Sequence, residues 1–122
     1  MFLILFSFSS AQNELQQVKI GEDIGPLCRL EGVNHCQALA EDAREKGGSI
    51  LTAKSSMPDR GFFFRPTVVF NLNTSMRLWS EEAFGPIFGV MAVEDDAQAV
   101  KAMNDSEYGL TASVFTKVVS VC

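Results

Sequence analysis

The segment VNHCQALAEDAREKGGSILTA, residues 33–53, decides the fold because a helix pattern, a stop signal and a strand pattern follow one another in it. Gly47 and Gly48 are typical of the end of a helix. The apolar stretch Ser49–Ala53 follows at once as a predicted strand. The helix is predicted from apolar side chains that recur at spacings of three and four residues and so share one face, namely Val33, Cys36, Leu39, Ala40 and Ala43.

The same alternation continues toward the C-terminus. Pro66 removes one hydrogen-bond donor and keeps the residue before it out of a helix, so the next strand is predicted at Thr67–Phe70. IFGVMAVE, residues 87–94, predicts a further strand, and TASVFTK, residues 111–117, a third β-rich segment after residues 67–70. The sequence therefore predicts an α/β fold with a mostly parallel sheet and flanking helices.

The second helix is predicted over DDAQAVKAMND, residues 95–105. Asp95 or Asp96 is suited to cap its first turn, because a carboxylate accepts hydrogen bonds from the free N–H groups there. Its buried stripe is predicted to consist of Ala97, Val100 and Met103. The following Tyr108 and Gly109 are expected to form a turn with a buried ring.

Length and composition limit the class of protein. The 122 residues suit at most one domain, and ten phenylalanines favour a packed interior over disorder. The formal net charge of -5 argues against a nucleic-acid partner, since no basic patch is present to neutralise phosphates. A Lys/Arg cluster for an anionic membrane surface is also missing from the sequence.

The cysteines and the single histidine give no metal signature. Cys28, Cys36 and Cys122 show no CxxC spacing, and a zinc site needs about four ligands. We expect reduced, structural cysteines in the cytoplasm or a mitochondrion, and no metal. His35 is expected on the first helix. Its expected role is structural, and the alternative is a metal-ligand or catalytic role.

The stretch SEEAFGPIFGV, residues 80–90, is the candidate binding site. A carboxylate accepts hydrogen bonds from vicinal hydroxyls, as acidic side chains do for ribose in dinucleotide sites, and a phenylalanine ring packs against a flat heterocycle. The alternative is that Glu81 and Glu82 are surface charges and Phe84 belongs to the core. The usual catalytic signatures are absent, since the sequence has no GxSxG, P-loop, HExxH or GxGxxG.

GFFFRPTVV, EEAFGP and NDSEYGLTASVFTK follow one another with the order and spacing found in the aldehyde dehydrogenase superfamily, which this chain resembles over about residues 19–117. The resemblance implies oxidation of an aldehyde to a carboxylic acid with NAD or NADP. In that family the second glutamate and the phenylalanine of EExFGP contact the nicotinamide ribose and ring region. They correspond to Glu82 and Phe84, while Gly85 and Pro86 shape the turn.

The departures from the family pattern set the remaining expectations. The family's nucleophilic cysteine and general-base glutamate have no counterpart in this sequence, so no catalytic residue is assigned and the isolated chain is expected to be inactive. Residues 1–18 are expected to be an atypical apolar start foreign to the domain, residues 19–117 a partial catalytic domain, and residues 118–122 an atypical tail. A secretory signal is the less favoured account of the start, because MFLILFSFSSAQ lacks a basic region and is short.

Two function hypotheses follow. One is a fragment of an NAD(P)-dependent aldehyde dehydrogenase, in which the aldehyde is the substrate of the full-length enzyme. The other is a non-catalytic product that associates with full-length dehydrogenase subunits through exposed strand edges.

Overall fold

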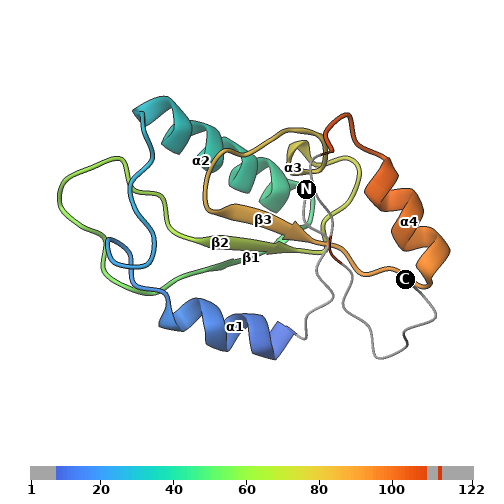
Figure 1. Ribbon diagram of the computed structural model, residues 1–122, viewed down its shortest axis with the longest axis horizontal. Coiled ribbons are helices and arrows are strands. Elements are labelled where there is room, and N and C mark those ends of the chain that lie inside the picture. The colour runs from blue at the N-terminus through green and yellow to red at the C-terminus, as the bar shows by residue number, and fades with distance from the viewer. Residues whose placement is uncertain (1–7, 110–112, 114–122) are drawn as a thin grey trace.

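The computed structural model describes residues 8–109 and residue 113, with side chains from residue 13 onward. Figure 1 shows a central sheet with α2 and α3 over one face, α1 across the other face, and α4 beside one end. The elements in chain order are α1 (Phe8–Gln17), α2 (Leu30–Glu45), β1 (Ser49–Thr52), β2 (Thr67–Phe70), α3 (Arg77–Ser80), β3 (Ile87–Val90) and α4 (Asp96–Asn104).

The three described strands have the order β1-β2-β3. β1 and β2 are antiparallel, with Ser49 opposite Phe70, whereas β2 and β3 are parallel, with Thr67 opposite Ile87. The link between β2 and β3 includes α3 and is long enough for a parallel crossover, whereas the link between β1 and β2 contains no helix. The predicted α/β class with flanking helices is confirmed, and the parallel arrangement holds for the β2–β3 pair.

Apolar cover on both faces explains why every residue of β2 is buried. Alternate side chains of a strand point to opposite faces. Val69 joins one apolar cluster with α2, α3 and Ile87, and Val68 and Phe70 join a second cluster with Leu15 of α1. The core is therefore two layers divided by the sheet.

Helix α2 confirms the prediction made from its apolar spacing. Val33, Cys36, Leu39 and Ala43 are all buried. Gly47 has a φ of +90°, a left-handed conformation that favours glycine, and the backbone N–H of Gly48 donates to the carbonyl of Ala43 at 2.7 Å. These contacts end the helix and lead directly into β1.

Helix α1 is an element that the sequence patterns do not predict. Its Leu15 is 6% exposed and packs in the second apolar cluster. In the part of the chain that the structure describes, no helix is both long and apolar enough to cross a membrane. The predicted β-rich segment 111–117 lies outside the described residues apart from Ser113, which is in no regular element.

The predicted buried stripe of α4 is wrong. Val100 and Met103 are 56% and 37% exposed, Ala97 is also exposed, and Ala102 is the buried residue of the helix. The helix contacts the rest of the described chain through its small side chains, so its larger apolar residues face outward. The predicted cap is confirmed, because the Asp95 carboxylate accepts a hydrogen bond from the backbone N–H of Gln98 at 2.7 Å.

The buried ring predicted at Tyr108 is also wrong, since this residue is 54% exposed. Its backbone N–H donates to the Ser106 hydroxyl at 3.1 Å, a local contact that bends the chain just after α4. Neither apolar cluster includes residues beyond Ala102 among those described, so the ring lies outside the core.

Candidate functional site

The segment of residues 81–86 lies between α3 and β3 and is fixed at both ends by backbone hydrogen bonds. The N–H of Glu81 donates to the carbonyl of Arg77 at 2.8 Å, which continues the last turn of α3. At the other end the N–H of Thr67 donates to the carbonyl of Pro86 at 2.9 Å and joins the segment to β2. We call residues 81–86 the EEAFGP turn.

Helix α2 holds the middle of this turn. The His35 Nε2 atom lies 3.1 Å from the carbonyl oxygen of Glu82, and the Cys36 thiol donates to the carbonyl of Ala83 at 3.6 Å. Gly85 is pressed against the same cysteine, because a Cβ atom added at Gly85 would lie 2.4 Å from the Cys36 Sγ atom. A glycine is required here for close approach of the backbone to α2.

Phe84 stands at the exposed part of the turn. Phe84 is 78% exposed, and its backbone φ of 47° is left-handed, which is uncommon for a residue other than glycine. Such a conformation costs about 1–3 kcal/mol and is typical of ligand-contact and active-site positions. The interpretation of Phe84 as a core residue is therefore wrong, and an apolar ring is presented at the surface.

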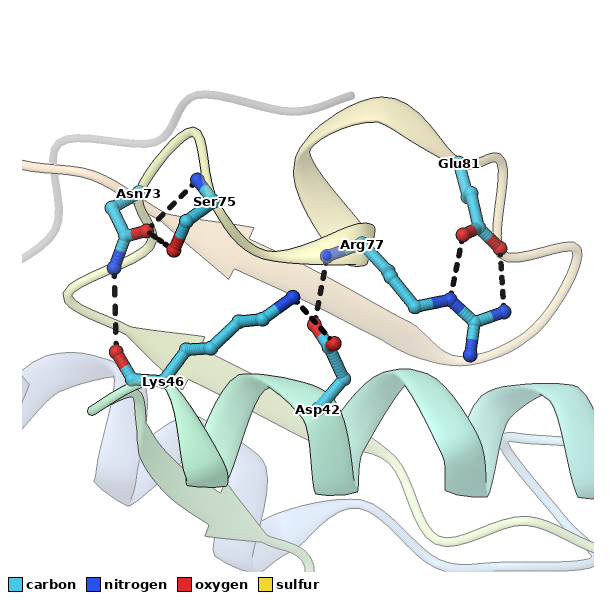
Figure 2. A network of polar contacts seen from close by, with 6 residues as sticks. All are labelled: Asp42, Lys46, Asn73, Ser75, Arg77 and Glu81. Carbon is cyan, nitrogen blue, oxygen red and sulfur yellow. Dashed lines mark hydrogen bonds and ion pairs between the residues drawn. The ribbon is translucent and has the colours of Figure 1, made fainter.

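The two adjacent glutamates have different environments, as Figure 2 shows for the first. The Arg77 guanidinium donates two hydrogen bonds to the Glu81 carboxylate, at 2.6 and 2.9 Å, and lowers the pKa of that carboxyl. Glu82 is exposed, and within residues 8–109 its carboxylate makes no hydrogen bond or ion pair. The Glu81 carboxylate is thus hydrogen-bonded within the protein, whereas the Glu82 carboxylate is exposed without a partner among the described residues.

A polar network behind the turn fixes α3 on α2 (Figure 2). The Asp42 carboxylate accepts hydrogen bonds from Lys46 Nζ at 2.6 Å and from the backbone N–H of Arg77 at 2.8 Å. The Lys46 bond and then the Arg77 bond lower the pKa of Asp42. Asn73 adds a weaker link, since its Nδ2 atom donates to the carbonyl of Lys46 at 3.5 Å.

Sequence reasoning missed the structural roles of Asp42, Arg77 and His35. The spacing of Arg77 and Glu81 is the i,i+4 spacing of a helical ion pair and could have identified that contact. Asp42 reads as a solvated acid of α2, and its partner Arg77 lies 35 residues away. His35 and Glu82 are 47 residues apart, so no local pattern connects them.

The described cysteines are poor candidates for a nucleophile. Cys36 is fully buried, and burial raises the pKa of its thiol, which disfavours the reactive thiolate. Cys28 is exposed, and Cys122 lies outside the described residues. Across the described part of the chain, no group of three or more His, Cys, Asp and Glu side chains is placed to hold a metal ion.

A hollow of about 470 Å³ lies elsewhere, between α2, β1 and the loop that follows β1. Arg44, Thr52, Phe63 and Arg65 are among its lining residues, and no residue of the EEAFGP turn is. Glu82 and Phe84 therefore lie away from this hollow, and both are exposed. The turn presents a hydrogen-bond acceptor at residue 82 and an apolar ring two residues later, both exposed.

Comparison with known protein families agrees with the resemblance of the sequence motifs. The sequence model of the aldehyde dehydrogenase family matches residues 8–122. The chain belongs to the aldehyde dehydrogenase family. This match begins before residue 19, where the resemblance of the sequence motifs starts.

Individual relatives give the extent of the similarity. The chain is 33% identical over 100 residues to a succinate semialdehyde dehydrogenase of Acinetobacter baylyi, with 82% of this chain and 21% of that protein covered. A betaine aldehyde dehydrogenase from Staphylococcus aureus, solved in complex with NAD+, superposes with a TM-score of 0.79 at 34% identity and covers 93% of this chain and 24% of its own.

A structure of an NADP dependent enzyme from E. coli superposes with a TM-score of 0.82 at 27% identity, over 93% of this chain and 25% of that one. The chain therefore spans about a fifth to a quarter of the length of these relatives. Its α/β architecture is that of part of an aldehyde dehydrogenase structure.

Proposed function

We propose that this chain is a segment of an NAD(P)-dependent aldehyde dehydrogenase, in which Glu82 and Phe84 contact the nicotinamide end of the cofactor. The observation that carries the proposal is the exposed, left-handed Phe84 two residues after Glu82, whose exposed carboxylate has no partner among the described residues. A relative solved with NAD+ and a relative described as NADP dependent support either nucleotide as the cofactor.

The residues of the EEAFGP turn fit such a group. A carboxylate accepts hydrogen bonds from the two vicinal hydroxyls of a ribose, and neither carboxylate oxygen of Glu82 is hydrogen-bonded to the residues that the structure describes. The Phe84 ring would limit where the flat nicotinamide lies. Glu82 and Phe84 would hold this group, which would supply a hydride acceptor for the oxidation of an aldehyde. Glu81 would remain with Arg77 and would support the turn without touching the cofactor.

The contact can be tested with nicotinamide mononucleotide, which carries the ribose and the nicotinamide ring. Glu82→Gln removes the charge and should weaken its binding to the chain about tenfold, because hydrogen bonds to a charged group contribute about 1.5–3 kcal/mol. Glu45→Gln removes an exposed acid of α2 and serves as the matched control. Equal affinity of the Glu82 variant and the control would refute the cofactor contact.

We also propose that the 122-residue chain does not turn over aldehyde by itself. The buried thiol of Cys36 supports this, and so does the lack of the family's nucleophile context around Cys28 and Cys122. Purified chain mixed with aldehyde and NAD should produce no reduced cofactor. Turnover above that of a denatured control would overturn this part of the proposal.

The second candidate function is a non-catalytic chain that associates with full-length dehydrogenase subunits. Within the described part of the sheet, β1 and β3 each pair with one strand, and α4 presents Val100 and Met103 outward. Unpaired strand edges are templates for another chain. Co-purification of the 122-residue species with a full-length dehydrogenase would support association, and its consistent absence from that complex would remove this candidate.

The domain division and the compartment remain proposals. Residues 19–117 would be the partial catalytic domain, with residues 1–18 and 118–122 as atypical ends. The free thiols of Cys28 and Cys36 support a reducing compartment, either the cytoplasm or a mitochondrion. Localisation of the tagged chain in fractionated cells tests the compartment, and recovery from the secretory fraction would refute it.

A further inference from the structure

His35 is the single histidine of the chain and lies on the part of α2 that contacts the EEAFGP turn. Its half-buried ring faces the EEAFGP turn, and its Nε2 atom lies 3.1 Å from the carbonyl oxygen of Glu82. A carbonyl oxygen only accepts, so this contact is a hydrogen bond when Nε2 carries a hydrogen. The bond therefore selects one form of the neutral ring.

The histidine acts on the turn together with the residue that follows it. Cys36 donates to the carbonyl of Ala83, and its sulfur is the surface on which Gly85 is seated. The contacts with α2 thus fall on residues 82, 83 and 85 and flank Phe84, the residue with the left-handed backbone. Tertiary contacts on both sides of a strained residue are what keep it strained.

We propose that His35 is a positioning residue for the cofactor contacts: by fixing the carbonyl of Glu82, it orients the Glu82 carboxylate and holds Phe84 in its exposed left-handed conformation. Its effect on ligand binding rests on the function proposed above. Its effect on the turn does not, because the geometry is present in the chain without a ligand.

Two variants of His35 separate the hydrogen bond from simple packing. His35→Gln places an amide N–H at nearly the position of Nε2 and retains a donor to the Glu82 carbonyl. His35→Phe keeps a ring of similar shape and removes the donor. Asn34→Ala alters the preceding residue, which is exposed on the same helix, and is the matched control.

The first measurement is the conformation of the turn in the ligand-free full chain, by amide NMR of isotopically labelled protein. A positive φ at Phe84 brings its own amide and α protons close together and gives a strong nuclear Overhauser effect between them. We expect this effect in the wild type, in His35→Gln and in Asn34→Ala, and its loss in His35→Phe. Retention of the effect in a folded His35→Phe chain would overturn the proposal.

If His35→Phe does not fold, the wild-type imidazole nitrogen shifts provide the deciding measurement. They should show a hydrogen on Nε2, and a ring that carries its only hydrogen on Nδ1 would overturn the proposal. Binding is measured separately with nicotinamide mononucleotide, for which His35→Phe should lose about threefold to tenfold in affinity and His35→Gln should recover most of it. If the wild type does not bind this probe, the proposed function fails, whereas the role of His35 is still decided by the turn.

Discussion

Replacing Gly85 by alanine tests how tightly the EEAFGP turn is seated on α2. The new Cβ atom would lie 2.4 Å from the Cys36 Sγ atom, about 1 Å inside the optimal separation of about 3.5 Å for non-bonded heavy atoms. Cys36 is 0% exposed and cannot move its sulfur into solvent. Overpacking of this kind costs about 1–3 kcal/mol, so we expect the free energy of unfolding to fall by that amount.

The Cys36→Ala background shows whether the sulfur is the cause. With Sγ removed, the nearest neighbours of the new Cβ would be the Leu27 methyl groups at 3.6 Å, an ordinary contact distance. In that background Gly85→Ala should change the free energy of unfolding by no more than about 0.5 kcal/mol. The difference between the two backgrounds measures the coupling between positions 36 and 85.

Urea unfolding followed by the fluorescence of Trp79 provides the assay, since this single tryptophan is 6% exposed in the core. Gly25→Ala is the control, because a Cβ atom at Gly25 would meet nothing within 4 Å. An equal loss of stability from Gly85→Ala in both backgrounds would refute the seating of this glycine on Cys36. A loss in Gly25→Ala of similar size would show that glycine replacement itself, and not the close approach, lowers stability.

Three further predictions concern the helices. Lys46 and Arg77 hold the pKa of Asp42 low, so the Asp42 carboxylate stabilises the fold above its usual pKa of about 3.9, and this stabilisation is lost as the pH falls through the folded-state pKa. Asp42→Asn should therefore flatten the acid side of a curve of stability against pH, and an unchanged curve would contradict this. Asp95→Ala should destabilise the chain by about 1 kcal/mol in urea unfolding through loss of the α4 cap, whereas no change would deny the cap a role. Val100→Ser should alter stability by less than about 0.5 kcal/mol, whereas Ala102→Asp should clearly lower the melting temperature. A larger loss from Val100→Ser than from Ala102→Asp would favour the buried face of α4 that the sequence predicts.

Local patterns were sufficient where one element decides the outcome. The apolar spacing of α2, the glycine after it and the proline before β2 each act within a few residues, and β2 was placed at Thr67–Phe70 as observed. The stripe of α4 failed for the opposite reason. Ala99 and Ala102 form a competing i,i+3 row, and the position of the helix beside the sheet decides which row is covered. That position is a property of the tertiary structure and not of the nine helical residues.

Local sequence also predicts one part of the candidate site, whereas the other part depends on tertiary contacts. The motif predicts Glu82 and Phe84 as the cofactor contacts, but it does not show how an exposed ring is held there. That depends on Cys36 and His35, which lie on α2 and contact residues 47 positions later in the sequence.

The two adjacent glutamates show why neighbouring acids of one motif need not share a role. Arg77 makes a bidentate contact with Glu81, which ties the end of α3 to the start of the turn and leaves that carboxylate few free acceptor positions. Successive side chains in an extended segment point in opposite directions, and Glu81 has an extended backbone with a φ of -102° and a ψ of 139°. Directing Glu81 toward Arg77 therefore directs Glu82 away from it, while His35 fixes the Glu82 carbonyl on α2. The exposure of the Glu82 carboxylate thus depends on the contact between Glu81 and Arg77, so replacing Arg77 by alanine should weaken the proposed contact of Glu82 with nicotinamide mononucleotide.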